Sequence, residues 1–172
     1  MMIEILILRL FHVVGGILWA GSAIFNGALL LPALSGAGPA AGPVVAGLRK
    51  RGLFVFLPTV AVLTILSGIR LMWITSAGFS AAYFATPRGA TYAGAGAAAV
   101  VAFVLGMALS RPTGQKMGML MEQITRTTDQ AARTSLTEEL ATLQRRNATT
   151  NTLVVGLIAL SAVGMAVARY LG

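Results

Sequence analysis

The sequence predicts an all-α membrane protein, a four-helix transmembrane bundle with short amphipathic helices in its third connection. Of the 172 residues, 56% are hydrophobic and only 10% are charged, whereas a soluble domain carries about 25% charged residues. Four stretches are apolar over about 20 residues or more, the length that a helix needs to cross a bilayer. No separate soluble region is visible, so we expect a single integral membrane domain over residues 1–172.

The four apolar stretches define the expected spans. Their approximate boundaries are residues 3–31, 52–75, 91–110 and 151–171. We expect the first span to stop at Pro32 and the third to stop before Arg111 and Pro112, because proline lacks the N–H that a helix interior needs. Strong turn residues fill the first connection, "PALSGAGPAAGPVVAG". The first stretch carries Glu4 and no basic leader, so we interpret it as a retained helix rather than a signal peptide.

The third connection, residues 111–150, also has helical periodicity. Its apolar residues fall at helical spacing in two pieces: Met117, Leu120, Met121 and Ile124, then Leu136, Leu140 and Leu143. Ser135 and Glu138 fit a capping box for the second piece. We expect either two short amphipathic helices at the membrane surface or helical extensions of the third and fourth spans. This segment could dock a partner protein, or it could only connect the spans.

Basic residues predict the orientation of the spans. Three end the first connection and six lie in the third: Arg49, Lys50, Arg51, Arg111, Lys116, Arg126, Arg133, Arg145 and Arg146. By the positive-inside rule these connections are cytoplasmic and both termini face outward. The net charge of +8 is then typical of basic loops beside an anionic bilayer, and it does not indicate nucleic-acid binding.

The only histidine, His12, lies inside the first apolar stretch. An ionisable residue in hydrocarbon is costly and is a functional-site hypothesis by default. A rise of 1.5 Å per residue places His12 about 13 Å below the outer surface, and Arg9, Arg70 and Met165 about 8–9 Å below it. His12 could therefore ligate haem b, with Arg9 and Arg70 as propionate partners and Met165, or a small molecule, at the other axial position.

Other interpretations of these residues stay open. His12 could be a neutral structural residue, hydrogen-bonded to a helix carbonyl or to Ser67, or it could bind copper or transfer protons. The arginines could reach outward to lipid phosphates, and Arg9 could instead pair with Glu4. A homodimer would supply a second His12. No cysteine is present, so thiolate ligands and thiol nucleophiles are excluded, and no catalytic residue is assigned.

Small residues recur at every fourth position of the third span: Gly94, Ala98, Ala102 and Gly106. Such a stripe lets two helix backbones approach closely in lipid. The partner helix could belong to the same bundle or to another subunit. The second case defines an alternative function, a non-catalytic accessory subunit of a larger membrane protein complex.

The first span, "FHVVGGILWAGSAIFNGALLLPAL", resembles that of the copper-resistance protein D-like superfamily of small bacterial membrane proteins. "LTILSGIRLMW" resembles the second span of these proteins, and "AVARYLG" resembles the last span of an uncharacterised branch. The resemblance implies a bacterial inner membrane and His12 as the haem or metal contact. With the orientation expected from the basic residues, both termini would then be periplasmic or extracellular. A haem-binding relative oxidises protoporphyrinogen and pairs its histidine with an intramembrane lysine. Here Lys50 and Lys116 lie outside the predicted spans, so the resemblance does not imply that activity.

Overall fold

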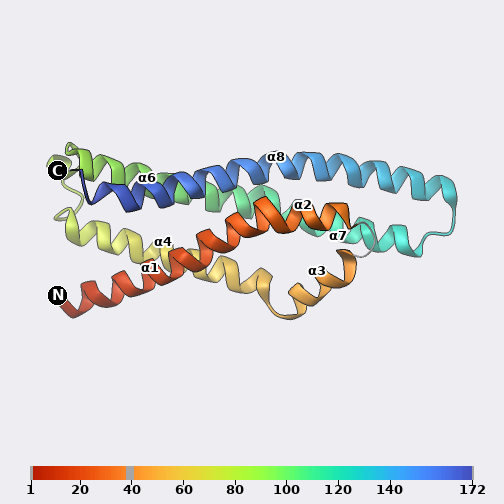
Figure 1. Ribbon diagram of the computed structural model, residues 1–172, viewed down its shortest axis with the longest axis horizontal. Coiled ribbons are helices and arrows are strands. Elements are labelled where there is room, and N and C mark those ends of the chain that lie inside the picture. Colours follow the sequence, from red (N-terminus) through yellow and green to blue (C-terminus); the bar gives the residue numbers. More distant parts are fainter. Residues whose placement is uncertain (1, 38–40, 172) are drawn as a thin grey trace.

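The computed structural model describes residues 2–37 and 41–171, and within these ranges it is helical and contains no strand. Four of its helices are long and apolar enough to cross a membrane. They form two antiparallel hairpins, in which α1 (Met2–Phe25) packs against α4 (Leu53–Thr75), and α6 (Pro87–Leu105) packs against α8 (Gln130–Ala168). Figure 1 shows both chain ends at one end of the bundle, which we call the terminal end. The prediction of an all-α bundle is confirmed.

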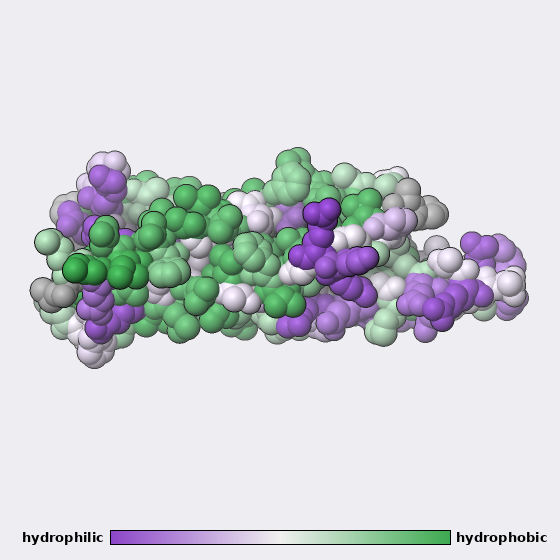
Figure 2. Space-filling view, turned by 90° about the horizontal axis from the view of Figure 1, so that it is seen from below, coloured by the Kyte–Doolittle hydropathy of each residue, from purple (hydrophilic) through white to green (hydrophobic). Residues whose placement is uncertain are grey.

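Shorter elements connect or extend these four helices. They are η1 (Asn26–Leu30), α2 (Leu31–Gly36), α3 (Ala41–Lys50), α5 (Ala81–Phe84), η3 (Gly106–Ser110) and α7 (Arg111–Arg126). Figure 2 shows the surface of the spans as a broad apolar band with hydrophilic residues at both ends. This surface is compatible with contact to the hydrocarbon of a bilayer.

The expected helix stops at Pro32 and before Arg111 are wrong, because both helices continue past their prolines. The first apolar helix runs over Met2–Leu34 and the third over Pro87–Arg126. A π-helical turn precedes each proline: the N–H of Leu31 donates to Asn26 O in η1, and the N–H of Arg111 donates to Gly106 O in η3. The wider turn makes room for a proline ring that would clash with the carbonyl four residues earlier in a regular helix.

The two connections at the end opposite the termini are also more helical than expected. The Pro/Gly/Ala-rich stretch forms α2 and α3, while residues 38–40 lie outside the described part of the chain. The third connection follows the second alternative, because α7 and the first half of α8 extend the spans (Figure 1). Ser135 and Glu138 do not cap a separate helix. They lie inside α8, whose N-cap is Asp129, which accepts from the N–H groups of Ala131 and Ala132.

The stripe of small residues on α6 packs mainly inside the chain. Ala98 and Ala102 are buried and Gly94 is exposed. The backbones of α6 and α8 approach so closely that a Cβ added to Gly164 would lie 2.9 Å from Cβ of Ala95. Ala95, which makes this close contact, lies beside the stripe and is not part of it. Within the stripe, Ala98 and Ala102 are buried inside the chain, whereas no atom lies within 4 Å of a Cβ added to Gly94 or Gly106.

Candidate functional site

The site predicted around His12 lies in the contact between α1 and α4. The Nδ1 atom of His12 is 2.8 Å from the carbonyl oxygen of Thr64. A carbonyl oxygen can only accept a hydrogen bond, so Nδ1 carries a proton and donates a hydrogen bond to Thr64 O. In neutral imidazole the lone pair is then on Nε2. No hydrogen bond joins Nε2 to any residue that the structure describes.

The imidazole fits against α4 because residue 68 is a glycine. A Cβ added to Gly68 would lie 2.7 Å from Cε1 of His12 and 3.0 Å from its Nδ1. Real Cβ atoms do not approach other atoms as closely as the first distance, so any larger residue would displace the ring or separate the helices. The position of Gly68 thus determines where the histidine ring can lie.

Two buried hydroxyl groups of α4 complete this polar region. The Ser67 hydroxyl lies 2.7 Å from Leu63 O and 3.0 Å from Thr64 O, and the Thr64 hydroxyl donates to Val60 O at 2.8 Å. Thr64 O therefore has both His12 Nδ1 and Ser67 Oγ as neighbouring donors. We call His12, Thr64 and Ser67 the polar seam, because they lie between two apolar helices and each donates from its side chain to a backbone carbonyl of α4.

Arg70 lies on the same pair of helices but is engaged by an acid. Its Nη2 and Nε atoms donate to Oε1 of Glu4 at 2.6 and 3.0 Å. Both side chains are about half exposed, at 50% for Arg70 and 41% for Glu4. The sequence suggested this pairing for Arg9, but Arg9 is exposed and forms no ion pair within residues 2–37 and 41–171. Of the two arginines, Arg9 is therefore the one that remains available to an anionic ligand.

Met165 packs against a different helix pair from His12. Its Cε atom lies 4.0 Å from the position of a Cβ on Gly96, so its side chain contacts α6. His12 and Arg70 both belong to the α1–α4 contact. Of the four residues predicted for the site, the described contacts thus join His12 and Arg70 to one hairpin and Met165 to the other, while Arg9 lies exposed on α1.

Thr64 and Gly68 are the functional neighbours that the sequence analysis missed. Both contact His12 from the opposite helix, 52 and 56 residues along the chain. Their spacing of four residues on α4 places them on one helix face, which was a detectable signal. Among the described residues no group of three or more His, Cys, Asp or Glu side chains converges as a metal cage. The chain matches no protein-family model, no curated protein and no solved structure.

Proposed function

We propose that this chain is a small polytopic protein of a bacterial inner membrane that binds haem b through Nε2 of His12. The observation that supports this proposal is the hydrogen bond from His12 Nδ1 to Thr64 O at 2.8 Å. Histidines that ligate metals generally donate their other ring N–H to a carbonyl or carboxylate, which fixes the tautomer and the ring orientation. The half-buried imidazole of His12 has this arrangement.

The surroundings of His12 fit one axial ligand and one propionate partner. Gly16 lies one turn from His12 on α1, where an added Cβ would meet Thr64 Cγ2 at 3.9 Å. Arg9 lies at i−3 with no acidic partner among the described residues. Arg70 would have to leave Glu4 to serve a second propionate. Bound haem b would supply one-electron or small-molecule chemistry. The protein groups that we assign to it are therefore His12 and Arg9.

The other axial position would not come from Met165, because that side chain packs against α6. It would either stay open to a small molecule or be filled by His12 of a second copy in a homodimer. Copper is the weaker alternative, because this chain offers it one histidine and no cysteine.

The orientation is part of the same proposal. Both termini would face the periplasm or the extracellular side, because the other end of the bundle carries most of the basic residues. His12 and Arg9 would then lie in the outer leaflet. Propionate groups would point towards the outer surface, where Arg9 is closer to the terminal end than His12.

The absorbance spectrum of the gently purified full-length protein tests the assignment. We expect a Soret band, either directly or after reconstitution with haem, and we expect His12→Ala to abolish it or shift it. Adding imidazole to that variant should restore the band by occupying the space that the side chain leaves. The matched control is Phe11→Ala, which alters the adjacent exposed residue on α1. A wild-type protein that stays colourless after reconstitution, or a His12→Ala spectrum identical to that of wild type, would contradict the proposal.

A second candidate function, a non-catalytic subunit of a larger membrane complex, is favoured by α1. None of its described residues is fully buried, and large apolar side chains such as Leu6, Leu10 and Ile17 are exposed along it. This face could contact lipid or another subunit. Mild-detergent extraction followed by mass measurement separates the two cases, and a stable lone monomer would exclude the complex.

A further inference from the structure

The end of the bundle opposite the termini contains a zone of basic residues that the proposed function does not use. Its members lie where the apolar stretches give way to polar sequence on α3, α7 and α8. They are Arg49, Lys50, Arg51, Arg111, Arg145 and Arg146. We call this set the basic collar. Residues 112–144, which are the rest of α7 and the start of α8, form a narrower extension beyond the collar. Figure 2 shows hydrophilic residues gathered where the apolar band ends, before this extension.

The charge of the collar is not balanced, unlike that of the extension beyond it. In the extension Glu122 pairs with Arg126 at 2.6 Å, and Glu139 pairs with Lys116 at 2.7 Å. Asp129 caps the N-terminus of α8. The collar contains no acidic residue, and none of its six cations forms an ion pair within the described ranges. The segregation leaves a concentrated positive charge at one level of the molecule.

The packing of the extension brings two parts of the collar to one level. The Lys116–Glu139 ion pair fixes the register between α7 and α8. Arg111 lies five residues from Lys116 on α7, and Arg145 lies six residues from Glu139 on the antiparallel α8. Both steps lead towards the spans and cover about 8–9 Å of helix. Arg111 and Arg145 therefore lie at similar heights on facing helices.

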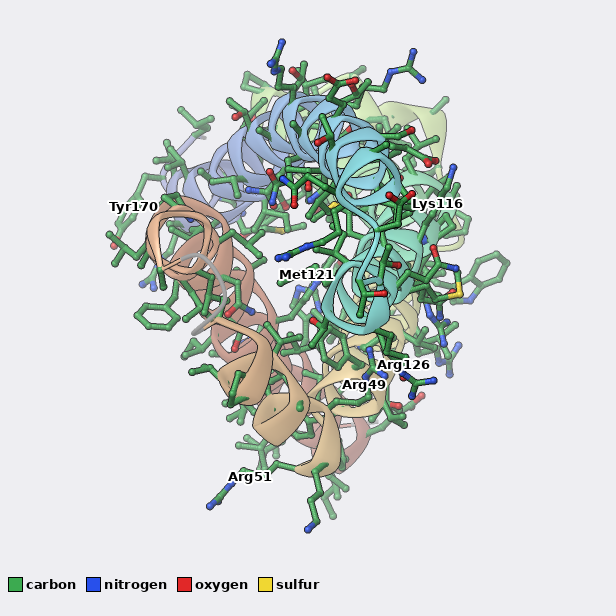
Figure 3. The ribbon with its side chains drawn as sticks, turned by 90° about the vertical axis from the view of Figure 1, so that its right-hand side faces the viewer. Arg49, Arg51, Lys116, Met121, Arg126 and Tyr170 are labelled. Atoms are coloured by element: carbon green, nitrogen blue, oxygen red, sulfur yellow. The ribbon has the colours of Figure 1, made fainter. Side chains whose placement is uncertain are left out.

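The third part of the collar reaches the same helices from α3. Nη2 of Arg49 lies 3.5 Å from the position of a Cβ on Gly118, so its guanidinium contacts α7 about 10 Å beyond Arg111. The chain turns sharply after Arg51 at Gly52, whose φ of 77° suits glycine and not other residues. In Figure 3, which looks along the bundle from this end, Arg51 extends away from the helices and Arg49 lies on the α7 side.

We propose that the basic collar binds the phosphate groups of anionic phospholipids, such as phosphatidylglycerol or cardiolipin. The collar lies at the boundary of the apolar band, which is where lipid headgroups lie. Five of its six members are arginines, whose planar donor pairs match phosphate oxygens bidentately. A soluble acidic partner would most easily reach the extension, but basic residues there are already paired with acidic ones. The unpaired positive charge therefore lies at the level of the lipid headgroups.

The test uses the full-length protein in an uncharged detergent, titrated with short-chain phosphatidylglycerol and followed by native mass spectrometry. Each basic residue near an anionic lipid surface contributes about fivefold in affinity. The variant Arg145→Gln/Arg146→Gln should therefore bind this lipid roughly 30-fold more weakly than wild type. Arg145→Lys/Arg146→Lys should keep most of the affinity, because it keeps both charges. The affinity for phosphatidylcholine, which has no net charge, should be low and the same for wild type and for both variants.

The matched control is Arg126→Gln/Arg133→Gln, which removes the same charge from the tip of the extension. Its affinity should stay within about twofold of wild type, because the tip lies beyond the Debye length of about 10 Å at 0.1 M salt. Equal losses in the collar and tip variants would show a general charge effect and overturn the proposal, as would equal binding of phosphatidylcholine. If the α8 variant does not fold by circular dichroism, Arg49→Gln/Arg51→Gln on α3 and its turn gives the same readout.

Discussion

The two hairpins of this protein each have a glycine at the contact between their helices, but the residue that the glycine faces differs. Between α1 and α4, Gly68 makes room for the imidazole of His12, which lies beside the buried Thr64 and Ser67. Between α6 and α8, Gly164 faces the methyl group of Ala95. Gly68 thus admits a polar side chain and Gly164 admits a close approach of two helices. Close approaches are not confined to α6–α8, because Gly15 of α1 also lies tightly against Thr64 of α4.

This difference indicates how the two hairpins divide their roles. Polar groups between membrane helices are costly unless each finds a partner, so the polar seam needs a well-determined geometry. The α6–α8 contact contains no histidine: α8 buries the hydroxyl group of Ser161, and Gly164 lies tightly against Ala95. We infer that α6–α8 is chiefly a packing unit and that α1–α4 is the hairpin that can hold a ligand.

The substitution Gly164→Leu should give the largest effect among the variants considered below, because it targets a close approach of two helix backbones. A Cβ alone would lie 2.9 Å from that of Ala95, so a leucine must push α6 away from α8. Overpacking of this kind costs about 1–3 kcal/mol or more. The free energy of unfolding, measured by denaturant titration in mixed micelles, should fall by about that amount.

The matched control is Gly156→Leu on the same helix. No atom lies within 4 Å of a Cβ added there, so the leucine side chain has space and the helix gains a better helix former. Its free energy of unfolding should be at least that of wild type. Equal destabilisation by both leucines would mean that the approach of Gly164 to Ala95 does not limit the packing of α6 against α8.

The next largest effect is expected at the contact that joins the two hairpins. Nδ2 of Asn151 on α8 donates to the carbonyl of Gly27 in η1 at 3.2 Å. In the π-helical register this carbonyl would receive its hydrogen bond from residue 32, which is a proline and has no N–H. Asn151→Ala leaves the carbonyl without this donor and should cost about 1–2 kcal/mol of unfolding free energy.

Asn147, one turn away on α8, provides the comparison. Its Oδ1 atom is buried without a hydrogen-bond partner, so removing it with Asn147→Ala should cost much less than the Asn151 change. A chemical denaturation series with both variants measures the difference. If Asn147→Ala proves the more costly, the assignment of Asn151 as the link between the hairpins fails.

The spans could be predicted from the sequence because hydrophobicity is a local property. The continuation of two helices past Pro32 and Pro112 could not be predicted in this way. Each needs a π-helical turn, and at Pro32 a freed carbonyl also needs a distant partner. The carbonyl of Gly27 finds its donor 124 residues later, in Asn151. The start of α6 was expected near residue 91, but Thr86 caps the helix by accepting from the N–H of Gly89, and Pro87 follows at the first helical position.

The candidate site was predictable only in part, for the same reason. His12 is conspicuous in an apolar stretch, and Arg70 could be placed near it by counting depth along the helices. The depth of a residue along its helix does not specify the direction in which its side chain points around the helix axis. Rotation turns Met165 towards Gly96, and it brings Thr64 and Gly68 to His12. These contacts depend on how the helices pack, which no single helix specifies.

The smallest expected effect lies inside the polar seam. Thr64 O has two neighbouring donors, His12 Nδ1 at 2.8 Å and Ser67 Oγ at 3.0 Å. His12→Phe or Ser67→Ala alone leaves the other donor in place, so each should cost about 0.6 kcal/mol. The double variant removes both side-chain donors and leaves this carbonyl only the backbone N–H of its own helix, so one of its two lone pairs loses every partner. Its loss should therefore exceed the sum of the single losses. A double-mutant cycle in micelles measures this coupling.

The control cycle combines His12→Phe with Ser161→Ala, a change at a buried serine of α8. Ser161 lies in the α6–α8 hairpin, so the losses of unfolding free energy from His12→Phe and Ser161→Ala should add. Additivity in both cycles would mean that His12 and Ser67 do not share the Thr64 carbonyl.

A small cost for His12→Phe has a further consequence for the proposed ligand. The variant then remains folded, and any loss of a haem spectrum reports the loss of a ligand and not the loss of the bundle.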